Sequence, residues 1–430
     1  MQTPGPALGP SPLAAGEKNL SLDEARAAIH AALRPISQTQ TLPLMQSLGR
    51  VLAADLVSPI NVPAHDNSAM DGFAFQGLDL QATGPTTLRP VGTVMAGAVF
   101  GSVVQAGECV RIMTGAVMPS GLDTVVPLEL CTGDAQQVRI QPGHLRPGDN
   151  RRRAGEDLAQ GQAALRQGRR LTPADLGLIA SLGIAEVTVF RRLRVALFST
   201  GDELRMLGQP LDEGCVYDSN RYSLMAALMR LDIDVIDLGL VADDPSALQT
   251  TLQTAMGQAD AVLTSGGVSA GDADHTRKVL AQMGTVAFWK VAMRPGRPFA
   301  FGPLHKPAEA ASNPLWLFAL PGNPVAALVT FFALVRPALQ QLSGALAVPM
   351  VALQARCTSA IRKRPGRSEF QRGIVEPKSS GGWQVRLTGS QGAGVLRSMS
   401  EANALIVLHH DQGSVAAGDL VDLWLFEGLT

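Results

Sequence analysis

The spacing of apolar residues changes character several times along this chain of 430 residues, which predicts several domains. Near the N-terminus, Ser21-Leu-Asp-Glu24 forms a capping box, and a helix with helically spaced apolar residues follows through about Leu33. A second helix is predicted after Thr172, with Pro173 in its first turn and Gly183 just past its end. We assign residues 19–56 and 147–190 to a helical linker domain.

Short apolar runs separated by glycine and proline turns are typical of residues 57–146. Val91–Met95, Cys109–Met113 and Thr124–Leu128 are examples of such runs. Runs of this length predict strands, so the segment is interpreted as a small β domain. The same pattern returns over residues 344–430 and predicts a C-terminal β domain, which we expect to be barrel-like.

Between residues 191 and 343, strand and helix patterns alternate. Strands are predicted at Val195–Ser199, Val235–Val241 and Ala261–Thr264, with helices beginning near Ser219 and after Asp244. This alternation predicts a central doubly wound α/β domain with a mostly parallel sheet. Such sheets bind ligands beyond the carboxyl ends of their strands.

Composition narrows the class of protein. A net charge of −1 gives no overall attraction for nucleic acid or an acidic membrane, so neither is expected as a partner. The four cysteines form no Cys-x-x-Cys pair, which argues against a zinc or dithiol site. No apolar run reaches the length of a membrane helix. Residues 1–18 are predicted to be a disordered tail, and a reduced, cytoplasmic protein is expected.

The segment Asp66–Phe73 is the first candidate for chemistry, because it places two carboxylates, an amide and a hydroxyl beside Gly72. It is too polar for a core strand and is interpreted as a loop that presents oxygen ligands. The basic turn Arg294–Pro298, with Lys290 before it, suits an oxyanion or a phosphate. A solvated basic turn is the alternative interpretation.

Glycine- and acid-rich loops follow the predicted strands of the α/β domain. The backbone N–H groups of Ser265–Gly271 are suited to a phosphate, although such a turn is often only a tight connection. Glu203, Asp243 and Asp274 suit Mg²⁺, and acids at helix N-termini that complement the dipole are the alternative. Pro321–Pro324 is at least a stiff turn from strand to helix. No Ser-His-Asp set, activated cysteine or metal-spaced histidine pair is readable.

These loops, in this order, resemble the MoeA-type molybdopterin molybdenumtransferases, including the E domain of gephyrin. The resemblance runs from about residue 20 to the end. The motifs that carry it are Asp66–Phe73, Ile112–Gly115, Arg153–Asp157, Ser199–Leu204, Ser265–Asp274 and Leu320–Pro324.

The resemblance implies insertion of molybdenum from molybdate into the dithiolene of adenylylated molybdopterin, with release of AMP and assistance from Mg²⁺. It also implies a homodimer with composite active sites, and as further partners it suggests the upstream adenylyltransferase and downstream molybdoenzyme maturation proteins. The catalytic positions it implies are Asp71, Thr114, Asp157, Glu203, Asp243 and Asp274, of which Asp71, Glu203, Asp243 and Asp274 would bind metal. The substrate-binding positions are Ser265, Gly266, Gly267, Ser269, Gly271, Lys290, Arg294, Pro321, Pro324 and Arg372.

Two departures from the family pattern stand out. The basic turn carries Arg294 and Arg297 where the family usually has lysines, and the C-terminal Gly389–Ala393 pattern lacks one hydroxyl, at Ala393. Two other functions compete with the main hypothesis. One is adenylylation of molybdopterin, against which the Asp66–Phe73 segment argues. The other is a gephyrin-like scaffold, against which the lack of an extra N-terminal domain and long linker argues.

Overall fold

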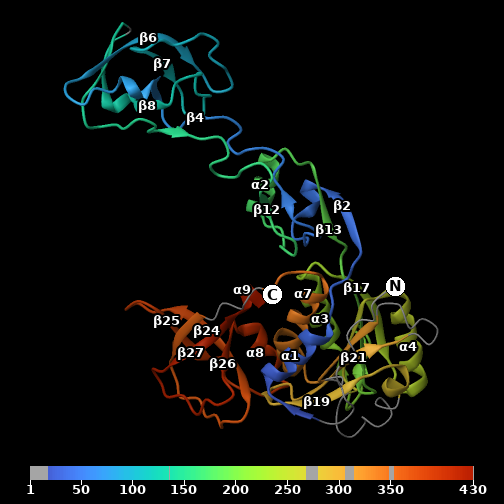
Figure 1. Ribbon diagram of the computed structural model, residues 1–430. Coiled ribbons are helices and arrows are strands. Elements are labelled where there is room, and N and C mark those ends of the chain that lie inside the picture. Colours follow the sequence, from blue (N-terminus) through green and yellow to red (C-terminus); the bar gives the residue numbers. More distant parts are fainter. Residues whose placement is uncertain (1–17, 135, 268–278, 306–313, 348–352, 430) are drawn as a thin grey trace. The chain divides into compact units, whose positions relative to one another are not determined.

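The computed structural model describes residues 18–134, 136–267, 279–305, 314–347 and 353–429 (Figure 1). They fall into two compact units. The first unit comprises Met1–Gln40, Gly49–Val51 and Val189–Thr430, and the second comprises Thr41–Leu48 and Leu52–Thr188. The chain passes between them through segments that include β2 (Thr39–Pro43) and β13 (Glu186–Phe190). Each unit is described by itself below.

The second unit contains the β domain that the short apolar runs predict. Its described strands form a six-stranded sheet in the order β8-β5-β7-β6-β10-β9. Their bounds are β5 (Gly72–Phe75), β6 (Thr86–Val94), β7 (Glu108–Ile112), β8 (Thr124–Pro127), β9 (Cys131–Gly133) and β10 (Val138–Ile140), with short helices η2 (Gly77–Asp79) and η3 (Leu128–Leu130) between them. Gly72 is required where β5 begins, since a Cβ there would lie 1.9 Å from the Val126 carbonyl oxygen.

The remainder of the second unit is built from short elements. They are η1 (Leu44–Ser47), β3 (Leu56–Val57), β4 (Asn67–Ser68), β11 (Arg151–Arg152), β12 (Ala163–Leu165) and α2 (Pro173–Ser181). β4 pairs with β11, and β3 pairs with β12. Helix α2 begins where the sequence predicts, because Thr172 and Asp175 cap it reciprocally.

The first unit contains the central α/β domain. Seven of its described strands form one sheet in the order β1-β19-β21-β22-β18-β14-β17. Their bounds are β1 (Lys18–Leu20), β14 (Arg194–Thr200), β17 (Asp234–Val241), β18 (Ala261–Ser265), β19 (Ala287–Val291), β21 (Pro298–Leu304) and β22 (Leu315–Leu320). Pairings of β21 with β19 and β22 are antiparallel and the others are parallel, which confirms a mostly parallel sheet.

The helices of this domain are α1 (Leu22–Ala32), α3 (Ser219–Met229), α4 (Pro245–Gln258), α6 (Pro324–Thr330), η4 (Phe331–Val335) and α7 (Arg336–Leu342); a short parallel pair, β15 (Leu204–Arg205) and β16 (Val216–Tyr217), projects after β14. The apolar stretch Pro324–Leu342 is long enough and apolar enough to cross a membrane, but 72% of its most apolar 18 residues are buried inside the protein. It therefore serves as a core helix. Leu252, Val262 and Leu317 lie in the core between α4 and the sheet.

The grouping of residues 19–40 differs from the domain boundary predicted from sequence. β1 pairs in parallel with β19, and α1 contacts α7 and η4, so this segment lies in the α/β unit. The capping box of Ser21 and Glu24 is present as predicted. A capping box marks where a helix begins, but it does not indicate which domain the apolar face of the helix packs against.

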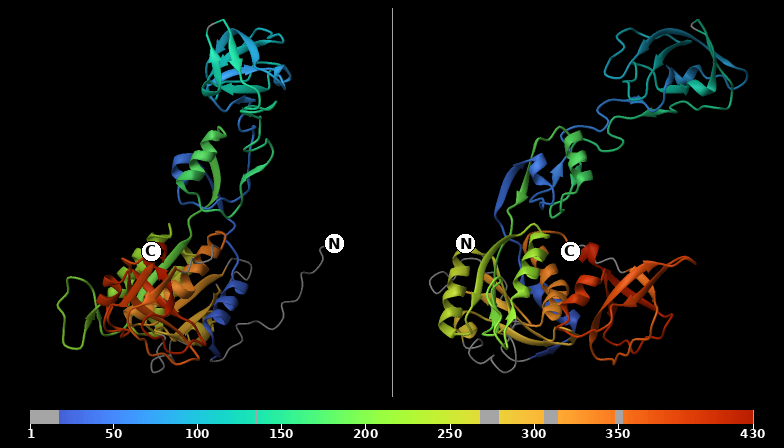
Figure 2. Two further views of the ribbon diagram at one scale, coloured as in Figure 1. Left: turned by 90° about the vertical axis from the view of Figure 1, so that its left-hand side faces the viewer. Right: turned by 180° about the vertical axis from the view of Figure 1, so that it is seen from behind.

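The C-terminal domain is the barrel expected from sequence. Among the described residues its strands are β23 (Leu353–Cys357), β24 (Ser368–Pro377), β25 (Trp383–Leu387), β26 (Ala404–Leu408) and β27 (Leu420–Leu425), with helices α8 (Leu396–Glu401) and α9 (Phe426–Leu429); the short strand β20 (Met293–Arg294) of the α/β domain joins its sheet. An additional pairing of β24 with β26 closes the ring of five strands from β23 to β27. β20 pairs with β24, so the barrel lies beside the α/β domain, as the right-hand view in Figure 2 shows.

Candidate functional site

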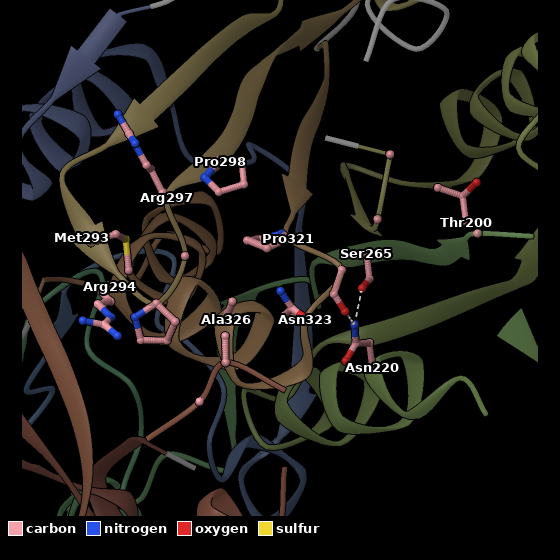
Figure 3. Close-up of a pocket in the computed structure, with 18 of the residues that line it drawn as sticks. Thr200, Asn220, Ser265, Met293, Arg294, Arg297, Pro298, Pro321, Asn323 and Ala326 are labelled. Atoms are coloured by element: carbon pink, nitrogen blue, oxygen red, sulfur yellow. Dashed lines mark hydrogen bonds between the residues drawn. The ribbon is translucent and has the colours of Figure 1, made fainter. Parts of the chain in front are cut away.

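A cavity of about 560 Å³ opens in the first unit at the carboxyl ends of β14, β18 and β22 (Figure 3). The turn between β19 and β21 forms a second wall, and a loop of the C-terminal barrel, Gln391–Ala393, forms a third. Helix α3 adds Asn220. The cavity thus lies where ligands bind in open α/β sheets, beyond the carboxyl edge of the parallel strands.

Glycine allows three backbone segments to converge at the floor of this cavity. Gly266 has a φ of 95°, and a Cβ on it would lie 2.3 Å from the Thr200 carbonyl oxygen. Its N–H donates to Leu320 O at 3.1 Å, and a Cβ on Gly322 would lie 3.8 Å from Gly266 Cα. The loops after β14, β18 and β22 are therefore in close contact, with little side-chain bulk to keep a phosphate from their backbones.

Guanidinium groups line the opposite wall. Arg294 and Arg297 are exposed side chains of the turn between β19 and β21, and Arg367 comes from the C-terminal domain. Arg367 pairs with the buried Glu369 carboxylate at 2.8 Å. Gly296 keeps the turn tight against α6, because a Cβ there would lie 2.2 Å from Thr330 Oγ1. This wall suits a planar, bidentate interaction with phosphate or another oxyanion.

Two carboxylates, Glu203 and Asp243, line the same cavity and are exposed to solvent. They follow β14 and β17, which are neighbouring parallel strands. Within the described part of the chain, no three His, Cys, Asp or Glu side chains gather as a ready-made metal site. The cavity therefore contributes two carboxylate ligands at most from these residues.

Arg372 supports the cavity from behind. Its side chain is 1% exposed and donates to Ser398 Oγ and to Gly392 O, both at 3.0 Å. Burial, and to a smaller extent the charge of Arg294, lowers the pKa of this guanidinium to about 10. Arg372 thus fixes the Gln391–Ala393 loop and places a buried positive charge near the cavity, although it does not line the cavity itself.

The second unit carries a separate polar loop around Asp71. The Asp71 Oδ1 atom accepts from Thr114 N at 2.7 Å and from Thr114 Oγ1 at 2.6 Å. These two bonds lower the pKa of the Asp71 carboxyl, so the group remains ionised well into the acid range. Asp66 Oδ1 accepts from Ala154 N at 2.8 Å, which joins the Asp66–Phe73 loop to the segment that contains Asp157.

The structure brings many of the predicted site residues together, but not all of them. The cavity is lined by Glu203, Asp243, Ser265, Gly266, Gly267, Arg294 and Pro321. Asp71, Thr114 and Asp157 belong to the second unit. Lys290 lies within β19, Pro324 is the first residue of α6, and neither lines the cavity. Ser269, Gly271 and Asp274 lie outside the described residues.

Sequence reasoning missed Asn220 and Arg367, and it noted Gln391 only as part of the Gly389–Ala393 pattern. Asn220 belongs to Asp218-Ser-Asn220 at the start of α3, and this polar triplet after an acid-rich loop was an available signal. Arg367 and Gln391 are distant in sequence from the α/β domain, and contacts such as the pairing of β20 with β24 and the hydrogen bond from Val325 N to Ala393 O bring their segments to the cavity.

Comparison with known proteins covers nearly the whole chain. Residues 20–183 match the MoeA N-terminal region (domain I and II), residues 196–341 a probable molybdopterin binding domain, and residues 354–426 the MoeA C-terminal region (domain IV). A molybdopterin molybdenumtransferase of Haemophilus influenzae is 42% identical over 95% of this chain and 99% of its own. Molybdopterin molybdenumtransferase 2 of Mycobacterium tuberculosis is 36% identical over 91% and 95%.

Solved structures agree with this match. The crystal structure of the molybdopterin biosynthesis MoeA protein from Pyrococcus horikoshii OT3 superposes with a TM-score of 0.79 at 27% identity, covering 95% of this chain and all of that one. Fold and sequence together define a transferase of molybdenum cofactor biosynthesis. The chain belongs to the MoeA family of molybdopterin molybdenumtransferases. The predicted fold class and family are confirmed.

Proposed function

We propose that this enzyme inserts molybdenum from molybdate into the dithiolene of adenylylated molybdopterin and releases AMP. The observation that carries the proposal is a single cavity of about 560 Å³ that combines glycine backbones, guanidinium groups and carboxylates. Its volume suits a small-molecule ligand, and its polar groups suit one that bears phosphates. Membership of the family supplies the class of reaction.

The two walls of the cavity have different proposed roles in binding the substrate. The Ser265–Gly267 turn is placed to bind phosphate oxygens, because it follows β18 at the carboxyl edge of the sheet; the Gly266 N–H donates to Leu320 O, so the Ser265 hydroxyl and the Gly267 N–H are the donors we assign to the phosphate. Arg294 and Arg297 belong to the turn between β19 and β21, which lines the other wall of the cavity, and we assign them to molybdate or a phosphate. Arg372 adds positive charge from behind and holds the Gln391–Ala393 loop in position.

The residues at the cavity fit a bound Mg²⁺. Mg²⁺ is commonly held by one or two carboxylates together with substrate phosphates, and Glu203 and Asp243 provide two carboxylates beside the glycine turns. When bound, the ion offsets phosphate charge and polarises the phosphate oxygens. The sulfur ligands for molybdenum belong to the substrate, so the chain's own residues serve to bind, orient and neutralise.

We further propose a homodimer with composite active sites, in which the loops that carry Asp71 and Thr114 in one subunit complete the cavity of the other. The support is that Asp71 is ionised, exposed and held by two hydrogen bonds, which suits contact with a ligand better than a role in the core. Two-fold dimers are also the commonest assembly. The enzyme is expected in the cytoplasm, in contact with the upstream adenylyltransferase and downstream maturation proteins.

One experiment separates this function from its competitors. Purified protein is incubated with adenylylated molybdopterin and Mg²⁺, with and without molybdate, and AMP is quantified by chromatography. Molybdate-dependent AMP release is expected. Formation of adenylylated molybdopterin from ATP and molybdopterin would instead indicate an adenylyltransferase. If neither reaction occurs, a non-catalytic scaffold is the alternative that remains.

A further inference from the structure

Asn220 joins two of the loops that form the floor of the cavity. Its Nδ2 atom donates to Ser265 Oγ at 2.7 Å and to Gly322 O at 2.6 Å (Figure 3). Ser265 ends β18, and Gly322 lies in the turn between β22 and α6. One amide group therefore connects the start of α3 to the Ser265–Gly267 turn, which the proposed function assigns to the phosphate-bearing substrate, and to the Pro321–Asn323 turn, which lines the same cavity.

The orientation of this amide follows from its partners. Gly322 O is a carbonyl oxygen and can only accept, so the group that faces it must be the NH₂ end of Asn220. Within the described part of the chain, Asn220 Oδ1 is buried and has no hydrogen-bond partner. The side chain is therefore held by its two donated bonds alone, and removal of the carbonyl end carries little cost.

The first turn of α3 holds Asn220 rigidly. Asp218, 2% exposed, caps the helix by accepting from Arg221 N at 3.2 Å, and it also accepts from Ser199 Oγ at 3.0 Å. Arg221 in turn makes two bonds to Asp237, at 2.7 and 2.9 Å. Asp218 and Arg221 are buried, whereas Asp237 is exposed, and together these contacts tie the start of α3 to β14 and β17 and hold Asn220 in position.

The bond from Asn220 also sets the chemistry of Ser265. The Ser265 oxygen uses a lone pair to accept from Nδ2, which leaves the hydroxyl proton for another acceptor. Ser265 lines the cavity, where phosphate oxygens are the acceptors that the proposed function requires. The same amide thus sets both the spacing of the two loops and the donor role of the serine.

We propose that Asn220 is a positioning residue for the phosphate-bearing substrate: it holds the Ser265–Gly267 turn and the Pro321–Asn323 turn at the separation that the substrate needs. This inference rests on the proposed function for the identity of the ligand. The two hydrogen bonds from Asn220, which we call the clamp, are a property of the unliganded protein and do not depend on that function.

The test compares Asn220→Asp, Asn220→Ala and the control Ser219→Asp. Asn220→Asp places a carboxylate against the Gly322 carbonyl and pushes the loops apart, whereas Asn220→Ala only removes the two bonds. Ser219→Asp adds the same charge one residue earlier, where the side chain does not line the cavity. AMP affinity is measured by calorimetry, and KM and kcat by molybdate-dependent AMP release.

Loss of the clamp should weaken AMP binding about fivefold in Asn220→Ala and about tenfold or more in Asn220→Asp, since each neutral hydrogen bond contributes modestly. The loss should appear in KM, with kcat and the melting temperature nearly unchanged, and Ser219→Asp should stay within about twofold of the original protein. A merely structural role would lower the melting temperature and leave KM unchanged, which would overturn the proposal.

Hydrogen exchange tests the clamp without any ligand. The Gly266 N–H donates to Leu320 O across the two loops, so peptides that contain Gly266 should exchange faster in Asn220→Ala. If the original protein releases no AMP, the proposed function fails while this measurement still decides on the clamp. Unchanged exchange together with unchanged AMP affinity in Asn220→Asp would contradict the inference.

Discussion

Single residues at the site owe their properties to a few short contacts. Asp71 is exposed, yet two hydrogen bonds from Thr114 keep the pKa of its carboxyl below the ordinary value. Arg372 is buried, and burial lowers the pKa of its guanidinium to about 10. The hydrogen bonds favour the charged form of Asp71, whereas burial disfavours the charged form of Arg372; with a pKa of about 10 the guanidinium still carries its charge at neutral pH.

The acid limit of activity should depend on Thr114. Thr114→Val keeps the shape of the side chain but removes the hydroxyl donor, which is the largest cause of the lowered pKa of Asp71. The Asp71 pKa then rises toward its ordinary value, so activity is lost at a higher pH as the solution is acidified. The pH profile of AMP release measures this shift. The control is Thr87→Val, which makes the same change at an exposed threonine. If both variants lose activity at the same pH on acidification, a role for Asp71 is contradicted.

Arg294 should act on an oxyanion. Removal of one charge-assisted contact costs roughly 1.5–3 kcal/mol, or about ten- to a hundredfold in affinity. Arg294→Ala is therefore expected to raise the molybdate concentration for half-maximal AMP release, with a smaller change in pterin affinity. Arg294→Lys keeps the charge but loses the planar guanidinium, so the molybdate concentration that it needs should lie between those of the original protein and Arg294→Ala. The control Arg386→Ala changes an exposed arginine and should shift this molybdate concentration less than about twofold. An equally small shift in Arg294→Ala would show that the basic turn is only a solvated surface turn.

At the scale of elements, the site depends on how loops leave the strands. The turns after β14 and β18 and the turn after β22 meet through Gly266 and Gly322, where a side chain would collide with backbone or crowd it. The basic turn comes from the two strands β19 and β21, which pair in antiparallel fashion. The sheet thus brings the phosphate wall and the basic wall to one edge, and small residues keep the space between them open.

The turn after β18 should not tolerate a side chain at its first glycine. In Gly266→Ala the new Cβ would lie 2.3 Å from Thr200 O, and the residue would keep an unfavourable φ of 95°. We expect at least a tenfold loss in AMP affinity, by calorimetry, with the far-ultraviolet circular dichroism retained. Gly257→Ala on α4 is the control, because a Cβ there meets nothing within 4 Å. Equal AMP affinity in both variants would show that this turn does not bind the nucleotide.

Helix α2 illustrates stability without a role at the cavity. Thr172 Oγ1 and N both donate to Asp175 Oδ2, at 2.8 and 2.9 Å, and Asp175 is 3% exposed. Thr172→Ala should therefore destabilise the helix by about 1 kcal/mol. Faster amide exchange across α2 would report the loss. Ser181→Ala at the other end of the helix is the control and should change exchange little; equal effects would contradict the importance of the cap.

At the scale of the whole molecule, the predicted site is divided between two compact units. Glu203 and Asp243 lie in the first unit, whereas Asp71 and Thr114 lie in the second. In the described part of the chain no group of three metal-ligating side chains forms. The homodimer that we propose would bring the two halves of the predicted site together, with the second unit of one subunit at the cavity of the other.

Mixing experiments test this arrangement directly. Asp71→Ala and Glu203→Ala subunits are each expected to be inactive in AMP release. In mixed dimers, one of the two composite sites would contain both original carboxylates, so about a quarter of the original activity should return if subunits exchange at random and each site acts independently. Sedimentation of tagged subunits verifies the exchange. No recovery despite proven exchange would place both carboxylates in a site within one chain.

The sequence by itself determined the local features of this protein. The capping boxes at Ser21 and the helix start at Thr172 are set by contacts within a few residues, and they appear where predicted. The alternation of strands and helices over residues 191–343 likewise determined a mostly parallel sheet, and the family motifs pointed to loops at its carboxyl edge. These features depend on residues close in sequence, so a linear pattern records them.

Only the tertiary structure decided which distant residues share one space. Asn220, Arg367 and Gln391 reach the cavity through pairings and contacts between segments far apart in the chain, and no local pattern encodes such proximity. The same holds for α1, whose apolar face packs in the α/β unit rather than with residues 147–190. A helix needs an apolar partner surface, and several domains offer one, so packing selects the partner only when the whole chain has folded.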